Sequence, residues 1–245
     1  MAKTNFLIKQ MAETNSLDLY IYDDVKGDST NWWTDEVTES TTSAKYMQSQ
    51  LEINKDVKAI NVFINSYGGS VKEGLAIHNQ LKRHTAYVTV YIDGFACSIA
   101  SVIAMAGDKV VMGNNCLMMV HHAAMGAYGN AEELRRAAND VEVIDSASCS
   151  SYLAKAGDKL TEATLKELLD GQTWLNAEQC LQYGLADEIT GKEDKIITEA
   201  KQRFNQAMQF EAEQFKKEIK VPENLITQKT NAEKLMAAFN KRMEE

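Results

Sequence analysis

The chain has 245 residues, of which 44% are hydrophobic and 25% charged, as expected for one soluble domain with room for an appendage. Lysine and arginine number 26 against 35 aspartate and glutamate, so the formal net charge of −9 offers no basic field to nucleic acid or to an anionic membrane surface. Four scattered cysteines without a C-x-x-C pair, and the absence of an apolar run of membrane-spanning or signal-peptide type, predict reduced thiols in a cytoplasmic protein.

Apolar periodicity predicts alternating strands and helices through the first half of the chain. β-branched or alternating runs indicate strands, whereas apolar residues three or four positions apart indicate helices. In chain order, the predicted elements are a strand at 17–25, a loop at 27–31, a helix at 37–51, a strand at 59–64, a helix at 71–81, a strand at 87–92, an apolar helix at 96–106 and short strands at 110–112 and 117–121. Repeated strand and helix units of this length favour an α/β fold over a sandwich or a bundle.

A long helix is predicted to follow these strands. Asn130 and Glu133 have the spacing of a capping box, so the helix should begin near residue 131, run towards residue 155 and end at Gly157. Two shorter helices are predicted beyond it, one opening at Thr161 and one over 177–183.

The composition changes after residue 189. Apolar residues recur there every three or four positions among many charges, in two stretches separated by the only proline, Pro222. We therefore divide the chain into a core domain at 15–190 and a helical C-terminal extension at 191–245.

Ser98 is the first candidate for chemistry, because it places a hydroxyl at the opening turn of the most apolar predicted helix. One interpretation is structural, since a buried helix serine commonly donates its hydroxyl back to a main-chain carbonyl. The other is catalytic, since free N–H groups at a helix start stabilise an oxyanion beside an attacking oxygen. The catalytic interpretation requires a base.

Only four histidines can supply that base. His78 falls within a helical pattern and His84 in the loop after it, so both are expected at the surface. His121 and His122 end a predicted strand, where neighbouring side chains point to opposite faces, so only one of them can share a face with Met119. A packed structural histidine is the alternative interpretation. The adjacent pair is also a poor metal site and no H-E-x-x-H motif is present, so no metal or other cofactor is expected.

Gly68 and Gly69 separate a predicted strand from the helix that follows it. The structural interpretation is a tight turn, and the functional one is a main-chain N–H at Gly69 directed at a substrate. The G-x-x-x-x-G-K-[ST] pattern is absent, so a nucleotide phosphate site is not supported.

Four segments are a weak signal one by one but together are specific for one protein family. They are INSYGGSV at 64–71, GFACSIAS at 94–101, MMVHH at 118–122, and WLNAE with YGLAD between 174 and 187. In order and spacing they resemble the proteolytic subunit of Clp protease (ClpP), over roughly residues 17–190. The resemblance implies an α/β fold of the ClpP/crotonase type, a ββα spiral from which the helix at about 131–155 protrudes as a handle.

The resemblance also implies roles for particular residues. Ser98 is expected as the nucleophile and His121 as the general base, with the N–H groups of Gly69 and Ile99 as the oxyanion hole. The position of the family's triad aspartate is occupied by Gln172, and Asp170 is the nearest carboxylate. We therefore assign Asp170 as the third catalytic residue, with two alternatives: Asp170 is a helix-end aspartate, or Gln172 orients His121 as a neutral acceptor.

Two N-terminal segments, YDDV at 22–25 and WWTDEV at 32–37, resemble phage-type ClpP relatives associated with head maturation. The predicted function is a serine-type endopeptidase that cleaves polypeptides through an acyl-enzyme, in phage or prophage head maturation. The predicted assembly is a homo-oligomer of stacked heptameric rings, and a Clp ATPase partner is left open.

The handle helix carries the apolar residues expected to join the rings, although packing on its own domain is the alternative. They are Leu134, Val141, Ile144 and Ala147.

Two rival functions remain at this stage. A crotonase-fold acyl-CoA enzyme would share the spiral and the oxyanion hole but would not need Ser98 paired with His121. A non-catalytic ClpP-like shell protein would explain the loss of the aspartate at Gln172.

Overall fold

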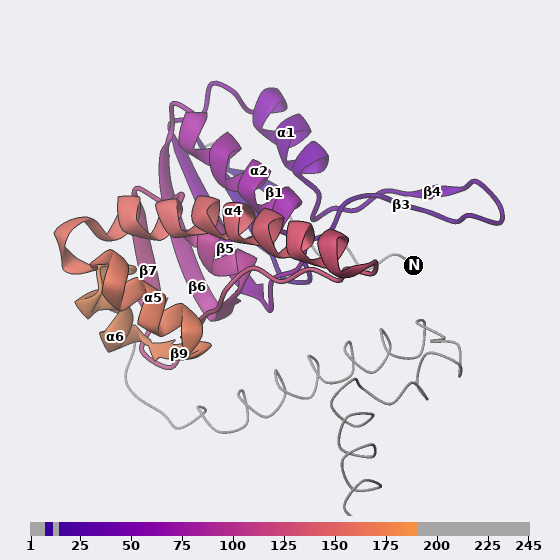
Figure 1. Cartoon of the computed structure of the whole chain (residues 1–245). Coiled ribbons are helices and arrows are strands. Elements are labelled where there is room, and N and C mark those ends of the chain that lie inside the picture. Colours follow the sequence, from indigo (N-terminus) through magenta and orange to yellow (C-terminus); the bar gives the residue numbers. More distant parts are fainter. Residues whose placement is uncertain (1–7, 12–14, 191–245) are drawn as a thin grey trace, which may run out of the picture. The chain divides into compact units, whose positions relative to one another are not determined.

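The computed structural model describes residues 8–11 and 15–190, and Figure 1 shows a mostly parallel sheet with helices packed against it. The predicted α/β class is therefore confirmed. The strands of the main sheet are β1 (Ile8–Met11), β2 (Ser16–Ile21), β5 (Ala59–Ser66), β6 (Tyr87–Cys97), β7 (Lys109–Gly113), β8 (Leu117–Val120), β9 (Thr173–Asn176) and β10 (Glu188–Thr190).

Strand β6 belongs to two parts of this sheet. Along the order β1-β2-β5-β6-β7-β10, only β1 and β2 are antiparallel. The first half of β6 pairs with β7 up to Ile92, whereas Phe95–Cys97 pair with β8, which in turn pairs with β9 in the antiparallel sense. The last residues of β6 therefore leave β7 and lie beside β8.

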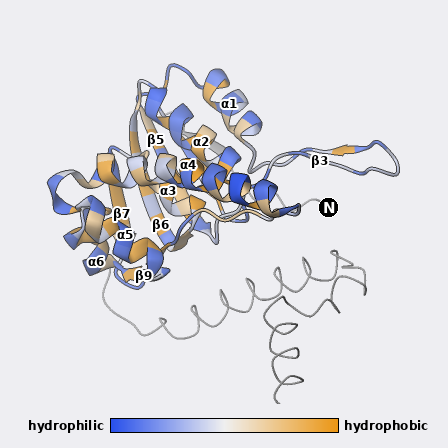
Figure 2. Ribbon diagram, viewed as in Figure 1, coloured by the Kyte–Doolittle hydropathy of each residue, from blue (hydrophilic) through white to orange (hydrophobic). Residues whose placement is uncertain are grey.

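One face of the sheet is buried because alternate strand residues are apolar. In β2 and β5 the fully buried side chains are every second residue, and the same alternation fills the start of β6. Orange strands beneath helices with blue outer faces show this division in Figure 2. The alternating core residues are Leu17, Leu19, Ile21, Ile60, Val62, Ile64, Val88, Val90 and Ile92.

The helices pack in sequence around the sheet. Helix α2 lies against α1 and α3, and α3 lies against α4. The helices are α1 (Ala44–Ile53), α2 (Val71–Arg83), α3 (Ile99–Ala104), α4 (Ala131–Ala156), the short 3₁₀ helix η1 (Gly157–Lys159), α5 (Glu162–Asp170) and α6 (Ala177–Gln182).

The long helix α4 begins and ends where its sequence predicts. Asn130 accepts hydrogen bonds from the N–H groups of Glu132 and Glu133, and the Glu133 carboxylate accepts one from the Asn130 N–H, which completes the capping box. Gly157 ends the helix with φ 57°, a left-handed conformation that glycine adopts without strain. The buried residues of α4 all lie in its last two turns, and residues 131–136 at its start are all exposed.

The helix predicted at 37–51 is wrong in its first part. Residues Ser29–Thr30 (β3) and Val37–Thr38 (β4) form a separate two-stranded hairpin, which projects from the sheet and helices in Figure 1. Helix α1 starts only after Ser43, whose hydroxyl accepts from the Tyr46 N–H at 3.1 Å. Hydroxyl side chains before α1 bond to one another and to the main chain, which favours a turn and an N-cap over a continuous helix.

The helix predicted at 96–106 also begins too early. Ala96 and Cys97 continue β6 and pair with Met118 and Met119, so α3 starts after Ser98. An apolar run of small residues suits a buried strand as well as a buried helix, and periodicity does not separate the two.

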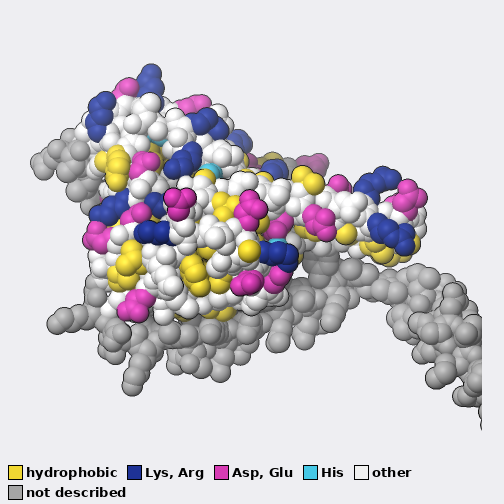
Figure 3. All heavy atoms as spheres, turned by 60° about the vertical axis from the view of Figure 1, so that its left-hand side comes forward, with side chains coloured by type: hydrophobic (Ala, Val, Ile, Leu, Met, Phe, Trp, Pro, Cys, Tyr) yellow, Lys and Arg dark blue, Asp and Glu magenta, His cyan; other side chains and the backbone are white. Residues whose placement is uncertain are grey.

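The predicted helical extension at 191–245 lies outside the described residues. Within 8–11 and 15–190, no helix is long and apolar enough to cross a membrane. Basic and acidic side chains are interspersed on the face that Figure 3 shows.

Candidate active site

The sequence-predicted residues meet where three parallel strands end. Ser66, the last residue of β5, pairs with Ala96 of β6, and Cys97, the last of β6, pairs with Met119 of β8. Parallel neighbours end at the same edge of a sheet, so the turns that follow these strands are side by side. These turns carry Gly68–Gly69, Ser98 and His121, and that edge is the candidate active site.

Ser98 sits on a sharp turn between β6 and α3. Its φ of 52° and ψ of −129° lie in a region that residues with a Cβ rarely adopt, at a typical cost of about 1–3 kcal/mol. The Ser98 N–H donates to the carbonyl of Met119 at 2.8 Å, which ties this turn to β8. The Ser98 side chain makes no capping hydrogen bond to α3, so its hydroxyl is available to another partner.

That partner is His121. The Ser98 Oγ lies 2.8 Å from the Nε2 of His121, within the range for a hydroxyl that donates to a neutral imidazole. Burial lowers the pKa of His121, although a hydrogen bond with the His122 backbone and the charge of Asp145 act in the opposite direction. The lowered pKa favours the neutral ring that a general base requires near neutral pH.

The side chain of His122 turns to different partners. Its Nδ1 lies 2.6 Å from Oδ2 of Asp145 on α4, and its Nε2 lies 2.9 Å from Oδ1 of Asp170 at the end of α5. Two carboxylate acceptors require both ring nitrogens to donate, as in the imidazolium. Burial acts to lower the pKa of His122, but these two hydrogen bonds outweigh it and the pKa is raised.

Asp170 is therefore not joined to His121 by any hydrogen bond among the described residues. Its carboxylate binds the ring of His122 and, at 2.6 Å, the Nζ of Lys166. The two neighbouring rings take different partners: the Nε2 of His121 lies against Ser98, whereas both ring nitrogens of His122 lie against Asp145 and Asp170. Gln172 is exposed, with φ 46°.

The carboxylate that acts most directly on His121 was not found from the sequence. Asp145 lies in the middle of α4, and its charge opposes the lowering of the His121 pKa by burial. Its Oδ1 also accepts from the Ala123 N–H at 2.7 Å, so it holds the segment after the histidines. No local pattern distinguishes Asp145 from the other carboxylates of α4.

The glycine turn after β5 lies against the turn that carries Ser98. Gly68 and Gly69 have φ 105° and 138°, and a Cβ on Gly68 would lie 2.8 Å from the Cβ of Ser98. Val25 is a partner that the sequence did not indicate: its N–H donates to the Gly68 carbonyl and its carbonyl accepts from the Ser70 N–H, at 2.7 Å each. Because hydrogen-bonding groups alternate along an extended chain, the N–H of Gly69 points away from Val25.

Cys97 is unsuited to replace Ser98. Its side chain is fully buried at the end of β6, and burial raises the pKa of its thiol far above neutrality. A buried thiol of this kind packs as a small apolar group.

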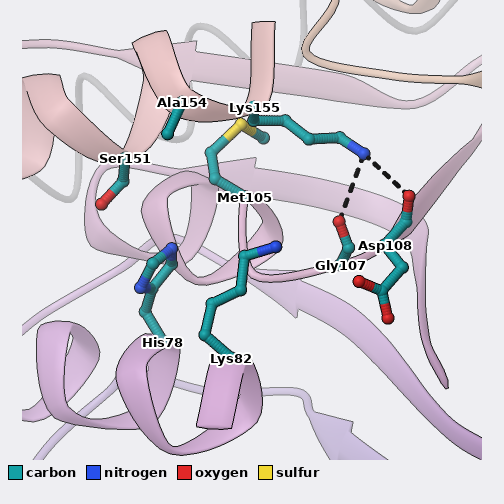
Figure 4. Close-up of a pocket in the computed structure, with 8 residues that line it drawn as sticks. All are labelled: His78, Lys82, Met105, Gly107, Asp108, Ser151, Ala154 and Lys155. Atoms are coloured by element: carbon teal, nitrogen blue, oxygen red, sulfur yellow. Dashed lines mark hydrogen bonds between the residues drawn. The ribbon is translucent and has the colours of Figure 1, made fainter. Parts of the chain in front are cut away.

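A separate cavity of about 300 Å³ lies near the C-terminal end of α3, whereas Ser98 lies at its N-terminal end. The cavity is lined by α2, the turn into β7 and α4. Figure 4 shows that Lys155 spans part of it and donates to the carbonyls of Gly107 and Asp108. No three His, Cys, Asp or Glu side chains within 8–11 and 15–190 are grouped to hold a metal ion. The cavity lining is His78, Lys82, Met105, Gly107, Asp108, Ser151, Ala154 and Lys155.

Comparison with known proteins identifies related sequences. The model of the Clp protease family matches residues 20–193. The ATP-dependent Clp protease proteolytic subunit of Ligilactobacillus salivarius is 31% identical over 148 residues, which cover 60% of this chain and 74% of that protein. The ATP-dependent Clp protease proteolytic subunit 1 of Protochlamydia amoebophila is 27% identical over 150 residues, covering 60% and 72%. The Leuconostoc citreum subunit is 31% identical over 145 residues, covering 58% and 72%.

Proposed function

The chain belongs to the Clp protease family, and from that premise we propose that it is a serine endopeptidase with Ser98 as nucleophile and His121 as general base. The observation that carries the proposal is the 2.8 Å approach of Ser98 Oγ to His121 Nε2. A hydroxyl is a weak nucleophile until an adjacent base takes its proton, and this contact provides that base.

The reaction uses the pair twice. His121 takes the proton as Ser98 Oγ bonds to the substrate carbonyl carbon, and returns it to the amine as the C–N bond breaks. Water then attacks the acyl-enzyme with His121 again as base, so that the acid product leaves and Ser98 regains its proton. The N–H groups of Gly69 and Ile99 stabilise the negative oxygen formed in each half. Ile99 follows Ser98 in the chain, and Gly69 follows Gly68, where an added Cβ would lie 2.8 Å from the Cβ of Ser98.

The proposed site differs from a simple Ser-His-Asp triad in its third residue, because no carboxylate is hydrogen-bonded to the ring of His121 among the described residues. Asp145 supplies the negative charge that favours the His121 imidazolium, and the His122 backbone receives the hydrogen bond of the ring. Asp170, which the sequence predicted as catalytic, acts through the ring of His122 together with Asp145. This arrangement needs no contribution from Gln172.

We also propose that the chain assembles into stacked rings through α4. None of the four predicted contact residues of α4 is buried in the described chain, and Leu134 leaves 45% of its surface exposed. Leu134 and Ala147 are exposed and Val141 and Ile144 are half-buried, so the stripe offers apolar surface to a second subunit. Rings that enclose Ser98 would restrict hydrolysis to unfolded polypeptides. A head-maturation role rests only on residues 22–25 and 32–37 and remains a prediction.

A covalent probe tests this function against both rivals. A fluorophosphonate should form one adduct, located on Ser98 by peptide mass spectrometry, and the protein should cleave unfolded casein. Ser98→Ala should abolish both, while retaining the sedimentation behaviour of the parent. A well-assembled parent that neither reacts nor cleaves would support a shell protein, and turnover of an acyl-CoA without Ser98 would support the crotonase-type alternative.

A further inference from the structure

Two buried hydroxyl groups form a chain that ends on the backbone of Ser98. Ser101 Oγ lies 2.6 Å from the Ser98 carbonyl oxygen and 2.6 Å from the hydroxyl of Tyr152 on α4. The Ser101 N–H donates to the same carbonyl at 3.0 Å. Ser101 is 0% exposed and Tyr152 1% exposed, so water does not replace these contacts.

The direction of the chain follows from counting protons. A carbonyl only accepts, so the single hydroxyl proton of Ser101 is donated to Ser98, and the Tyr152 hydroxyl must then donate to Ser101. Burial raises the pKa of Tyr152, which keeps that donor protonated. The order of donation is therefore Tyr152 to Ser101 to the Ser98 carbonyl.

The held carbonyl belongs to the same peptide group as the Ile99 N–H. A peptide group is planar, and no cis peptide is present among the described residues, so this C=O and N–H point in opposite directions. Fixing the Ser98 oxygen consequently fixes the direction of the Ile99 N–H. This matters at Ser98, whose φ of 52° is intrinsically unfavourable and has to be held by its surroundings.

We propose that Ser101 and Tyr152 are positioning residues that aim the Ile99 N–H at the substrate oxyanion. The inference rests on the proposed function, because it requires acylation of Ser98. Both Tyr152 and Asp145 lie on α4. The long helix therefore contacts Ser101, which bonds to the Ser98 carbonyl, and also contacts the ring of His122.

The test separates oxyanion stabilisation from substrate binding. Full-length parent, Tyr152→Phe and Ser101→Ala are compared on a fluorogenic dipeptidyl coumarin amide and on a peptide aldehyde, which forms a tetrahedral adduct with the nucleophile. We expect Tyr152→Phe to lower kcat about tenfold and Ser101→Ala up to about 100-fold, below the loss of a whole oxyanion donor. KM should change less than about twofold, and the aldehyde should bind more weakly by the same factor as the fall in kcat.

Three controls make the result specific. Tyr183→Phe removes a hydroxyl from a half-buried tyrosine at the end of α6 and should leave kcat unchanged. The pH midpoint of acylation should also stay unchanged in both test variants, because His121 is untouched. Sedimentation of each variant checks assembly.

The inference is overturned if both assembled variants keep the parent's kcat and aldehyde affinity, or if KM alone rises. It is equally overturned if both variants shift the pH midpoint, since the damage would then lie at His121. An inactive parent that no fluorophosphonate labels would instead remove the proposed function itself.

Discussion

The Nε2 of His121 lies 2.8 Å from the Oγ of Ser98 although 23 positions separate the two residues in the chain. The contact arises because the second half of β6 leaves β7 and pairs with β8, so that both residues follow strand ends at one edge of the sheet. The position of the candidate nucleophile next to its base is thus a consequence of strand pairing.

The identity of the nucleophile can be tested against its neighbour. Cys97→Ala should retain most fluorophosphonate labelling, because the thiol is buried and protonated, whereas Ser98→Ala should abolish labelling. Intact-mass spectrometry measures the adduct in both variants. Loss of labelling in Cys97→Ala alone, with unchanged sedimentation, would contradict the assignment.

The two adjacent histidines should differ in their effect on rate. His121→Ala removes the base and should lower the acylation rate by ~1,000-fold or more. His122→Ala leaves the contact between Ser98 and His121 in place and should cost much less, about tenfold. Stopped-flow labelling of the two variants provides the comparison, and equal losses would show that the assignment of base and support is mistaken.

The pH dependence of acylation should report His121. Because the base works only when neutral and burial lowers its pKa, the labelling rate should rise with pH through a midpoint below 6.5 and then level off. Labelling rates in buffers from about pH 4.5 to 9 give the midpoint. A midpoint well above 6.5 would mean that a different group is titrating.

The contacts of His122 should make the free energy of unfolding fall as pH rises, whereas the acylation rate set by His121 should rise with pH. Its folded pKa is raised, so its stabilising contribution is fully present below about 6.5 and is lost as pH rises through the folded pKa. The His122 side chain is 40% exposed and solvent screens the pairs, so the contribution should not exceed about 1 kcal/mol.

Chemical unfolding of the parent and His122→Gln at pH 6 and pH 9 measures that contribution. The difference in unfolding free energy between the two proteins should be larger at pH 6. A larger difference at pH 9 would contradict the proposed contacts with Asp145 and Asp170.

Assembly through α4 should be sensitive to charge on its apolar stripe. Ile144→Asp places a carboxylate within the stripe and should shift the protein towards smaller species in sedimentation velocity. Ser150→Asp adds the same charge at an exposed position of the same helix outside the stripe and is the matched control. The ring proposal fails if Ile144→Asp sediments like the parent, or if the parent is a fully active monomer at micromolar concentration.

Local sequence signals predicted most of the elements near the candidate site. The capping box at Asn130 and the glycine at Gly157 set both ends of α4, because each satisfies main-chain groups within one turn. The same local signals misplaced the start of α3, extended α1 back over β4 and gave β3 as loop, since apolar small residues and short polar segments fit more than one backbone conformation.

By itself the sequence indicated the candidates for chemistry: one serine at the start of a predicted helix, one pair of histidines at a predicted strand end, and two glycines between a strand and a helix. Only the tertiary structure decided which carboxylate serves which histidine and what holds the strained turn. Asp145, Asp170 and Tyr152 reach the site from α4 and α5, across contacts between residues at least 22 positions apart. Such contacts depend on how whole elements pack, because burial and hydrogen bonding between distant elements leave no periodic pattern in the chain.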